Sequence, residues 1–242
     1  MATLIVDIET KAVDWKELPG ITRAALTHRI DRANIADLEK NKKLDDVHSR
    51  LSLSPFTATI VSLAVYDVER KTGAVYFVSN TPDESFEVDG FVCKQRTETE
   101  ILEDFWEGAK GYDIFVTFNG RAFTMPFIHH RSIALGVRPT VGIARQRYVT
   151  KQQQPYHVDL MDEFSFHGNM QHRPSLQLLC GAYGIENPSV LGGEEIDAAF
   201  REERYRVIAE KNVGDVLALI SLYEKWLQYL APSSFVNTIE FL

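Results

Sequence analysis

Two acidic residues stand close together near the start of the chain, in the segment Val6-Asp7-Ile8-Glu9-Thr10. They follow the apolar run Thr3-Leu4-Ile5-Val6, which is typical of a buried β-strand. Side chains alternate between the two faces of a strand, so Asp7 and Glu9 project together while Ile8 turns into the core. Adjacent carboxylates repel each other unless they share a proton or a cation. A hard divalent cation such as Mg²⁺, which prefers oxygen ligands, is the natural partner.

Two later segments could complete a site with these acids. The first is a short apolar run that ends in Asn119-Gly120, and the second holds Asp215 within a helical pattern. Each feature also has an ordinary interpretation when it is taken alone. The acid pair then marks an exposed strand end, Asn119-Gly120 is a plain turn, and Asp215 is an exposed helix acid. The metal interpretation therefore depends on how the segments combine.

The elements that must position these residues follow from the hydrophobic periodicity. Strands are expected at residues 2–8, 56–68, 74–78, 86–92, 114–118 and 156–160. Helices are expected at 97–111, 122–135 and 175–184, with one or two more within 21–51. Residues 194–230 are helical in pattern, with a break near 212–214. This is a mixed α/β layout without a dividing linker, so we expect one domain over residues 1–242 with a helical insertion at about 11–55.

Composition sets further bounds. The 242 residues are 45% hydrophobic and 25% charged, which is ordinary for a globular protein. No apolar run approaches the roughly 18 residues that span a bilayer, and no signal peptide is visible, so no membrane partner is expected. Cys93 and Cys180 make no disulfide framework, which favours the cytoplasm. The net charge of −8 argues against a general electrostatic nucleic-acid binder, but not against an enzyme that grips a few phosphates.

In their order and residue types, the three segments resemble the DEDD-superfamily 3′–5′ exonucleases of the ribonuclease H-like fold. The closest resemblance is to predicted exonucleases similar to the proofreading domain of family B DNA polymerases. The likeness spans about residues 3–230 and includes Leu51-Ser52-Leu53-Ser54-Pro55-Phe56 and His157-Val158-Asp159-Leu160-Met161-Asp162. It implies an α/β fold with a mixed central sheet flanked by helices, and a helical C-terminal third.

The resemblance also implies roles for individual residues. Asp7, Glu9 and Asp215 are expected to be catalytic and to hold a first Mg²⁺ or Mn²⁺, with Asp7 also touching a second. Substrate contacts are expected from Thr10, from Asn119 beside the 3′ end of the bound strand, and from Phe123, Thr124 and Lys211. Phe123 is either a stacking surface for a base or a core residue.

Two positions depart from the family pattern. The pattern F-N-G-x-x-F-D-x-P has Asp where this chain has Thr124, a poor ligand for the second metal, and Asp113 lies at the wrong end of the preceding strand to replace it. The family's Tyr four residues before the third-motif Asp is Lys211, and its alternative His five before is Glu210. Lys211 could contact a phosphate and Glu210 could act as a base, although both read more simply as solvated helix residues.

Three hypotheses follow. The first is a metal-dependent 3′–5′ exonuclease acting on single-stranded DNA or frayed 3′ ends, with one metal site expected. The second is a catalytically impaired relative that binds nucleic-acid 3′ ends, which the changes at Thr124 and Lys211 favour. The third is an interaction or scaffold role that keeps only the fold. The 11–55 insertion is either a lid or a surface for a protein partner, and its residues do not distinguish the two. The three acids argue against the third hypothesis, because an interaction domain has no need for them.

Overall fold

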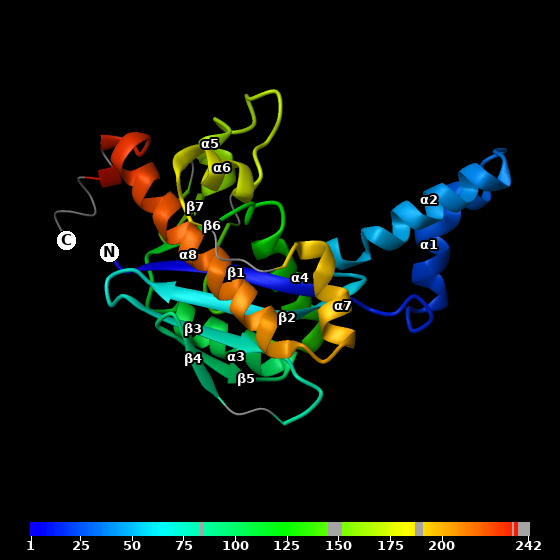
Figure 1. Ribbon diagram of the computed structural model, residues 1–242, viewed down its shortest axis with the longest axis horizontal. Coiled ribbons are helices and arrows are strands. Elements are labelled where there is room, and N and C mark those ends of the chain that lie inside the picture. The colour runs from blue at the N-terminus through cyan, green and yellow to red at the C-terminus, as the bar shows by residue number, and fades with distance from the viewer. Residues whose placement is uncertain (83–84, 145–151, 187–190, 234, 237–242) are drawn as a thin grey trace.

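A seven-stranded mixed sheet forms the centre of the computed structural model, which describes all residues except 83–84, 145–151, 187–190, 234 and 237–242. Its strands lie in the order β4-β5-β3-β2-β1-β6-β7 (Figure 1). Their bounds are β1 Thr3–Ala12, β2 Ala58–Asp67, β3 Thr72–Phe77, β4 Phe86–Val88, β5 Phe91–Gln95, β6 Ile114–Thr117 and β7 Tyr156–Asp159. The sequence-predicted α/β class with a mixed sheet flanked by helices is confirmed.

The strand pairing explains why β1 is the organising element. β1 pairs with β2 in antiparallel orientation on one side and with β6 in parallel orientation on the other. β2 and β3 form the expected antiparallel hairpin, and β6 pairs with β7 in parallel orientation. β1 therefore lies inside the sheet, and its neighbours come from distant parts of the sequence.

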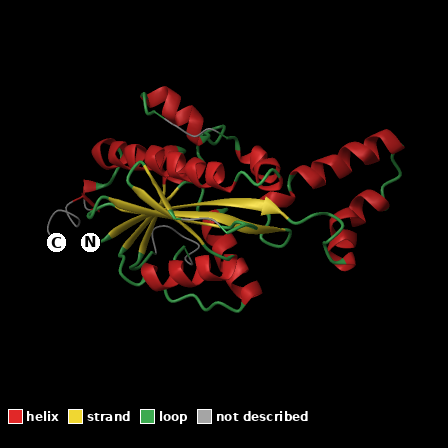
Figure 2. Cartoon of the chain, turned by 60° about the horizontal axis from the view of Figure 1, so that its bottom comes forward, coloured by secondary structure: helices red, strands yellow, loops and turns green. Residues whose placement is uncertain are grey.

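Helices cover both faces of the sheet, as Figure 2 shows. The helices α3 (Glu98–Ala109) and α4 (Thr124–Leu135) share one hydrophobic core with the sheet. The other face packs against α5 (Leu160–Phe164), α6 (Leu176–Tyr183), α7 (Ile196–Arg201) and the long α8 (Tyr205–Tyr229). The helical C-terminal third predicted from the sequence thus forms the helical layer on this face of the sheet.

Alternation along β1 decides which helix layer the acids face. Leu4, Val6 and Ile8 belong to the core beneath α3 and α4, whereas Ile5 belongs to the core beneath α8. Asp7 and Glu9 continue the series of Ile5, so they project toward α8. The prediction that Ile8 turns into the core while the two acids point the other way is confirmed.

Several boundaries differ from the sequence prediction. β1 continues four residues beyond residue 8, because its antiparallel pairing with β2 extends to Ala12, opposite Ala58. The acids therefore lie within the strand and not at its end. The single strand expected at 86–92 is the hairpin of β4 and β5, which turns at Asp89-Gly90 with both φ angles positive. The break expected near 212–214 is absent, since α8 runs unbroken through these residues.

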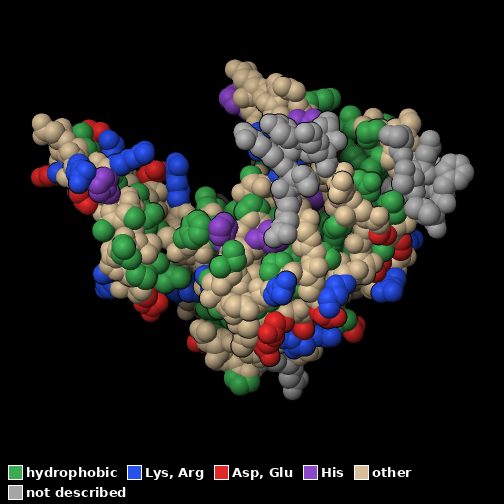
Figure 3. All heavy atoms as spheres, turned by 180° about the vertical axis from the view of Figure 1, so that it is seen from behind, with side chains coloured by type: hydrophobic (Ala, Val, Ile, Leu, Met, Phe, Trp, Pro, Cys, Tyr) green, Lys and Arg blue, Asp and Glu red, His purple; other side chains and the backbone are tan. Residues whose placement is uncertain are grey.

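Two helices leave the main body as an arm, formed by α1 (Gly20–Asp31) and α2 (Asp37–Ser49). Figures 1 and 3 show the arm standing apart, with a hollow between it and the body. α2 has no buried residue, so little of its surface contributes to a core. These helices lie where helical insertion was predicted. Within the described part of the chain, no helix has the length and apolar character required to cross a bilayer.

A buried polar contact joins β6 to β7 below the Asn119-Gly120 turn. The Thr117 hydroxyl and His157 Nε2 lie 2.8 Å apart, and both residues are buried. Gly120 is required here, because a Cβ on it would lie 1.9 Å from Thr117 Oγ1. Burial, helped by the positive charge of Arg121, lowers the pKa of His157 to about 3. His157 is thus a neutral link between the two strands.

This burial predicts acid destabilisation with a defined sign. The unfolded chain protonates His157 below its ordinary pKa of 6.5, while the folded protein does not until about pH 3. Stability from this residue is therefore present above pH 6.5 and is lost as the pH falls, by about 1.4 kcal/mol per pH unit once the pH is well below 6.5. The free energy of unfolding, measured by urea titration at several pH values, should fall less steeply in His157→Gln. The exposed His172→Gln should keep the wild-type slope, and equal slopes in all three proteins would contradict the assignment.

Candidate active site

Three carboxylates from distant segments meet between β1 and α8. One oxygen each from Asp7, Glu9 and Asp215 can be chosen so that all lie within 4.8 Å of one another. Glu9 and Asp215 are buried and Asp7 is partly exposed. From the sequence, Asp7 and Glu9 are expected to meet Asp215 in this way. A single cation placed between these oxygens could bridge the three carboxylates.

A lysine side chain lies inside this cluster. Lys211 is one helical turn before Asp215 on α8, and its Nζ donates to Asp215 Oδ2 at 2.6 Å and to Glu9 Oε1. Lys211 is only 5% exposed. The interpretation of Lys211 as a solvated helix residue is therefore wrong, because α8 packs this face directly on the sheet. The sequence did hold one signal, since Lys and Asp at i and i+4 share a helix face.

Burial and mutual repulsion set the protonation of the cluster. Burial, together with the charges of Glu9 and Asp215, raises the pKa of Asp7 well above its usual range. Burial also raises the pKa of Glu9 to about 7, although Lys211 pulls it downward. Burial alone would lower the pKa of Lys211, but the three surrounding carboxylates outweigh it and raise that pKa. The lysine therefore carries a positive charge among the three acids.

A neighbouring contact fixes the helix over the strand. Asn212, adjacent to Lys211, donates from Nδ2 to the Ser62 hydroxyl at 2.9 Å, and both residues are fully buried. Ser62 lies directly opposite Glu9 in the β1–β2 pairing. The contact therefore holds α8 in register beside the acids. Sequence reasoning missed this pair, because neither residue type signals its partner across 150 residues.

The Asn119-Gly120 turn is held by a carboxylate from β7. Asp159 accepts the backbone N–H of Asn119 at 2.8 Å and that of Arg121 at 2.9 Å, and it also caps α5. Asn119 adopts a φ of 57°, which the turn requires. The β1–β6 pairing aligns Ile5 with Val116, so the chain leaves β6 beside Asp7. Asp159 thus positions the turn next to the acids, a role that the sequence did not reveal.

The remaining predicted substrate residues have mixed environments. The Thr10 hydroxyl is already engaged, because it donates to the Ser52 carbonyl oxygen at 2.7 Å. Phe123 is partly exposed and packs against Phe127, with ring centroids 5.4 Å apart. Thr124 is buried, and its hydroxyl has no hydrogen-bond partner among the described residues. Their expected substrate contacts stay predictions.

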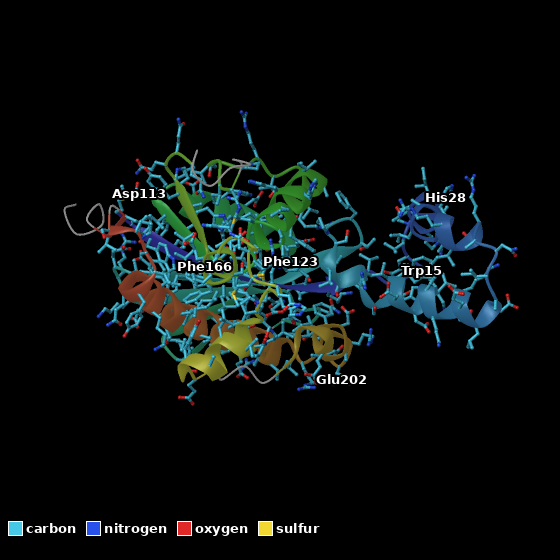
Figure 4. All side chains as sticks on the ribbon, turned by 90° about the horizontal axis from the view of Figure 1, so that it is seen from above. Trp15, His28, Asp113, Phe123, Phe166 and Glu202 are labelled. Carbon is cyan, nitrogen blue, oxygen red and sulfur yellow. The ribbon has the colours of Figure 1, made fainter. Side chains whose placement is uncertain are left out.

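Two other residues lie where the sequence analysis expected. Glu210 is exposed on α8. Asp113 precedes β6 and accepts the Ala2 N–H at 3.0 Å, at the opposite end of the strand from the turn. Figure 4 shows Asp113 well separated from Phe123. Asp113 therefore does not substitute for the missing second-motif Asp.

This donor set suits one divalent cation. Asp215 Oδ1 is buried and lacks a hydrogen-bond partner within the described residues, so it is available as a ligand beside the oxygens of Asp7 and Glu9. The position that holds a further carboxylate in the family pattern is occupied by neutral Thr124 in this chain. Lys211 also occupies the space between two of the three acids. Any cation that binds here must coexist with this ammonium group or displace it.

Comparison with known proteins places the chain in a family. The sequence matches the profile described as "Predicted 3'-5' exonuclease related to the exonuclease domain of PolB" over residues 65–234. No curated protein matches the chain. The fold is similar to the family B DNA polymerase from the hyperthermophilic archaeon Pyrobaculum calidifontis, with a TM-score of 0.58 and 17% identity. That match covers 94% of this chain and 24% of the polymerase chain. The chain belongs to the family of predicted 3′–5′ exonucleases related to the exonuclease domain of PolB.

Proposed function

We propose that this protein is a metal-dependent 3′–5′ exonuclease that hydrolyses phosphodiester bonds of single-stranded DNA or frayed 3′ ends. The observation that carries the proposal is the convergence of Asp7, Glu9 and Asp215 in a chain of this family. Asp7 and Glu9 come from one strand and Asp215 from a helix about 200 residues later, with their oxygens within 4.8 Å. A purely structural role gives no reason to bring three acids together in one place.

In this proposal the residues of the site have separate roles in binding the cation and the substrate. Asp7, Glu9 and Asp215 hold one divalent cation, which supplies Lewis-acid polarisation of the phosphodiester when bound. The turn at Asn119, held by Asp159, supports the 3′ end of the strand beside the acids. Phe123, which is partly exposed at the start of α4, offers a face for base stacking.

We further propose that residues 1–242 act as one exonuclease-type domain, with residues 11–55 as an insertion. The arm of α1 and α2 is the part proposed to meet a partner. It carries Ile21, 82% exposed, and Leu38, 70% exposed. Lys and Arg side chains also lie along the arm (Figure 3), and these could contact the phosphates of a bound strand.

A second candidate function is binding of nucleic-acid 3′ ends with little or no hydrolysis. Two observations favour it. Thr124 removes a carboxylate from the family pattern, and Lys211 places an ammonium group among the three acids. Both changes reduce the capacity for the metal chemistry, while leaving the fold and the turn in place.

The first prediction separates these functions. Wild-type protein incubated with a 5′-labelled oligonucleotide and Mg²⁺ or Mn²⁺ should produce a ladder that shortens from the 3′ end. Asp7→Ala should abolish it, because only two of the three acids would then remain, too few to hold the cation. Glu103→Ala, an exposed acid on α3 on the other face of the sheet, is the matched control and should keep wild-type activity. A gel-mobility shift without shortening would support the second candidate. The absence of both the mobility shift and the ladder would contradict both candidate functions.

The second prediction concerns the missing carboxylate. Thr124→Asp should raise the cleavage rate about tenfold or more, since each metal contributes several kcal/mol of transition-state stabilisation. Thr124→Asn introduces a side chain with the shape of Asp but without its charge, so it should not raise the cleavage rate. Single-turnover rates in Mn²⁺ provide the measurement. If wild type is already fast and Thr124→Asp changes nothing, the account of Thr124 as the limiting position is wrong.

A further inference from the structure

The Lys211 ammonium group occupies the place in the acidic cluster where a bridging cation is expected. Nζ contacts one oxygen of Glu9 and one of Asp215, and the Asp215 contact is 2.6 Å. Both partners and Lys211 itself are buried. The contact therefore differs from a surface ion pair, which solvent would screen. It joins β1 to α8 through a charge-assisted bridge at the centre of the site.

We propose that Lys211 is an internal cation that takes the place of a divalent metal between Glu9 and Asp215. The folded site is then partly charge-compensated without metal, and a divalent ion must displace the Lys211 ammonium to bind there. The inference deepens the proposed function, because it concerns the same carboxylates. Its test does not depend on whether the protein cleaves nucleic acid.

Charge and packing support this role. With all three carboxylates ionised the acids carry −3. The Lys211 ammonium then leaves a net charge of −2, whereas a divalent metal in its place would leave −1. Lys211 is held in place by the neighbouring Asn212–Ser62 contact, which fixes the helix over the strand. A tethered cation of this kind loses no translational freedom when it binds, so it competes effectively with a free ion.

The cluster nevertheless retains a free ligand atom. Asp215 Oδ1 is buried and has no partner in the described part of the chain, and it lies on the same carboxylate that Lys211 contacts through Oδ2. A metal could use Oδ1 with Asp7 while Lys211 stays in place. In that arrangement Lys211 would not compete, and its removal would not strengthen metal binding. The two arrangements therefore give opposite experimental results.

The test compares wild type with Lys211→Met and Lys211→Tyr, the second of which restores the residue type of the family pattern. Melting temperatures are measured without metal and during titration with Mn²⁺ or Mg²⁺, and Mn²⁺ affinity is measured by electron paramagnetic resonance. Wild type should melt at nearly the same temperature throughout. The variants should melt lower without metal and recover with it, and should bind Mn²⁺ about tenfold tighter or more, which corresponds to about 1.4 kcal/mol.

Two controls make the result specific to the cluster. Lys225→Met removes a partly exposed lysine farther along α8 and should behave as wild type. Adding Asp215→Asn to Lys211→Met should remove the metal response. Equal Mn²⁺ affinity in wild type and both Lys211 variants would overturn the proposal. So would variants that stay unfolded in the presence of metal, because a true substitute for a cation must be replaceable by one. Variants that fold only with metal would support it, and a nuclease-negative wild type would leave this comparison intact.

Discussion

Three carboxylates share the buried space beneath α8 because the same helix brings a positive charge with them. Lys211 and Asp215 lie one turn apart, and both reach the strand that carries Asp7 and Glu9. Without a compensating charge, burial of these acids would cost several kcal/mol and would favour protonation or separation of the two layers. Burial above all, with repulsion between the acids, keeps the pKa values of Asp7 and Glu9 raised even with Lys211 present. The electrostatics of the site and the packing of α8 on the sheet therefore depend on each other.

Buried hydrogen bonds supply the geometry that the charge cluster alone does not. Asn212 and Ser62 register α8 against β2. Asp159 holds the turn at the end of β6, and His157 with Thr117 joins the two strands below it. Each of these residues is buried and bonded to a segment far away in the sequence. Together they place the turn and the acids on one side of the molecule, and no single element does so by itself.

Local patterns were sufficient to predict much of this fold. The apolar runs located the strands, and Thr97 with Glu100 forms the capping box expected at the start of α3. Ser175 caps α6 as predicted, and Gly184 ends it in the left-handed region. The convergence of Asp7, Glu9 and Asp215 also followed from motif order. These features depend on short-range spacing or on a pattern shared with a family.

The missed features depend on tertiary context. Lys211 looked like a solvated helix residue, because spacing alone does not reveal that α8 buries this face. The break predicted at 212–214 is absent, because packing against the sheet overrides the weak helix propensity of Asn212 and Gly214. The extension of β1 to Ala12 depends on its partner β2, which no property of residues 9–12 discloses.

The central location of β1 has a consequence for dissecting the protein. The family profile begins at residue 65, whereas Asp7 and Glu9 lie far upstream on the strand between β2 and β6. A fragment trimmed to the matched region would lack β1 and most of β2, so the sheet would be split and β6 would gain an open edge prone to aggregation. Lys211 would then face Asp215 alone. The amino-terminal residues are therefore as necessary to the candidate site as the region that the family profile matches.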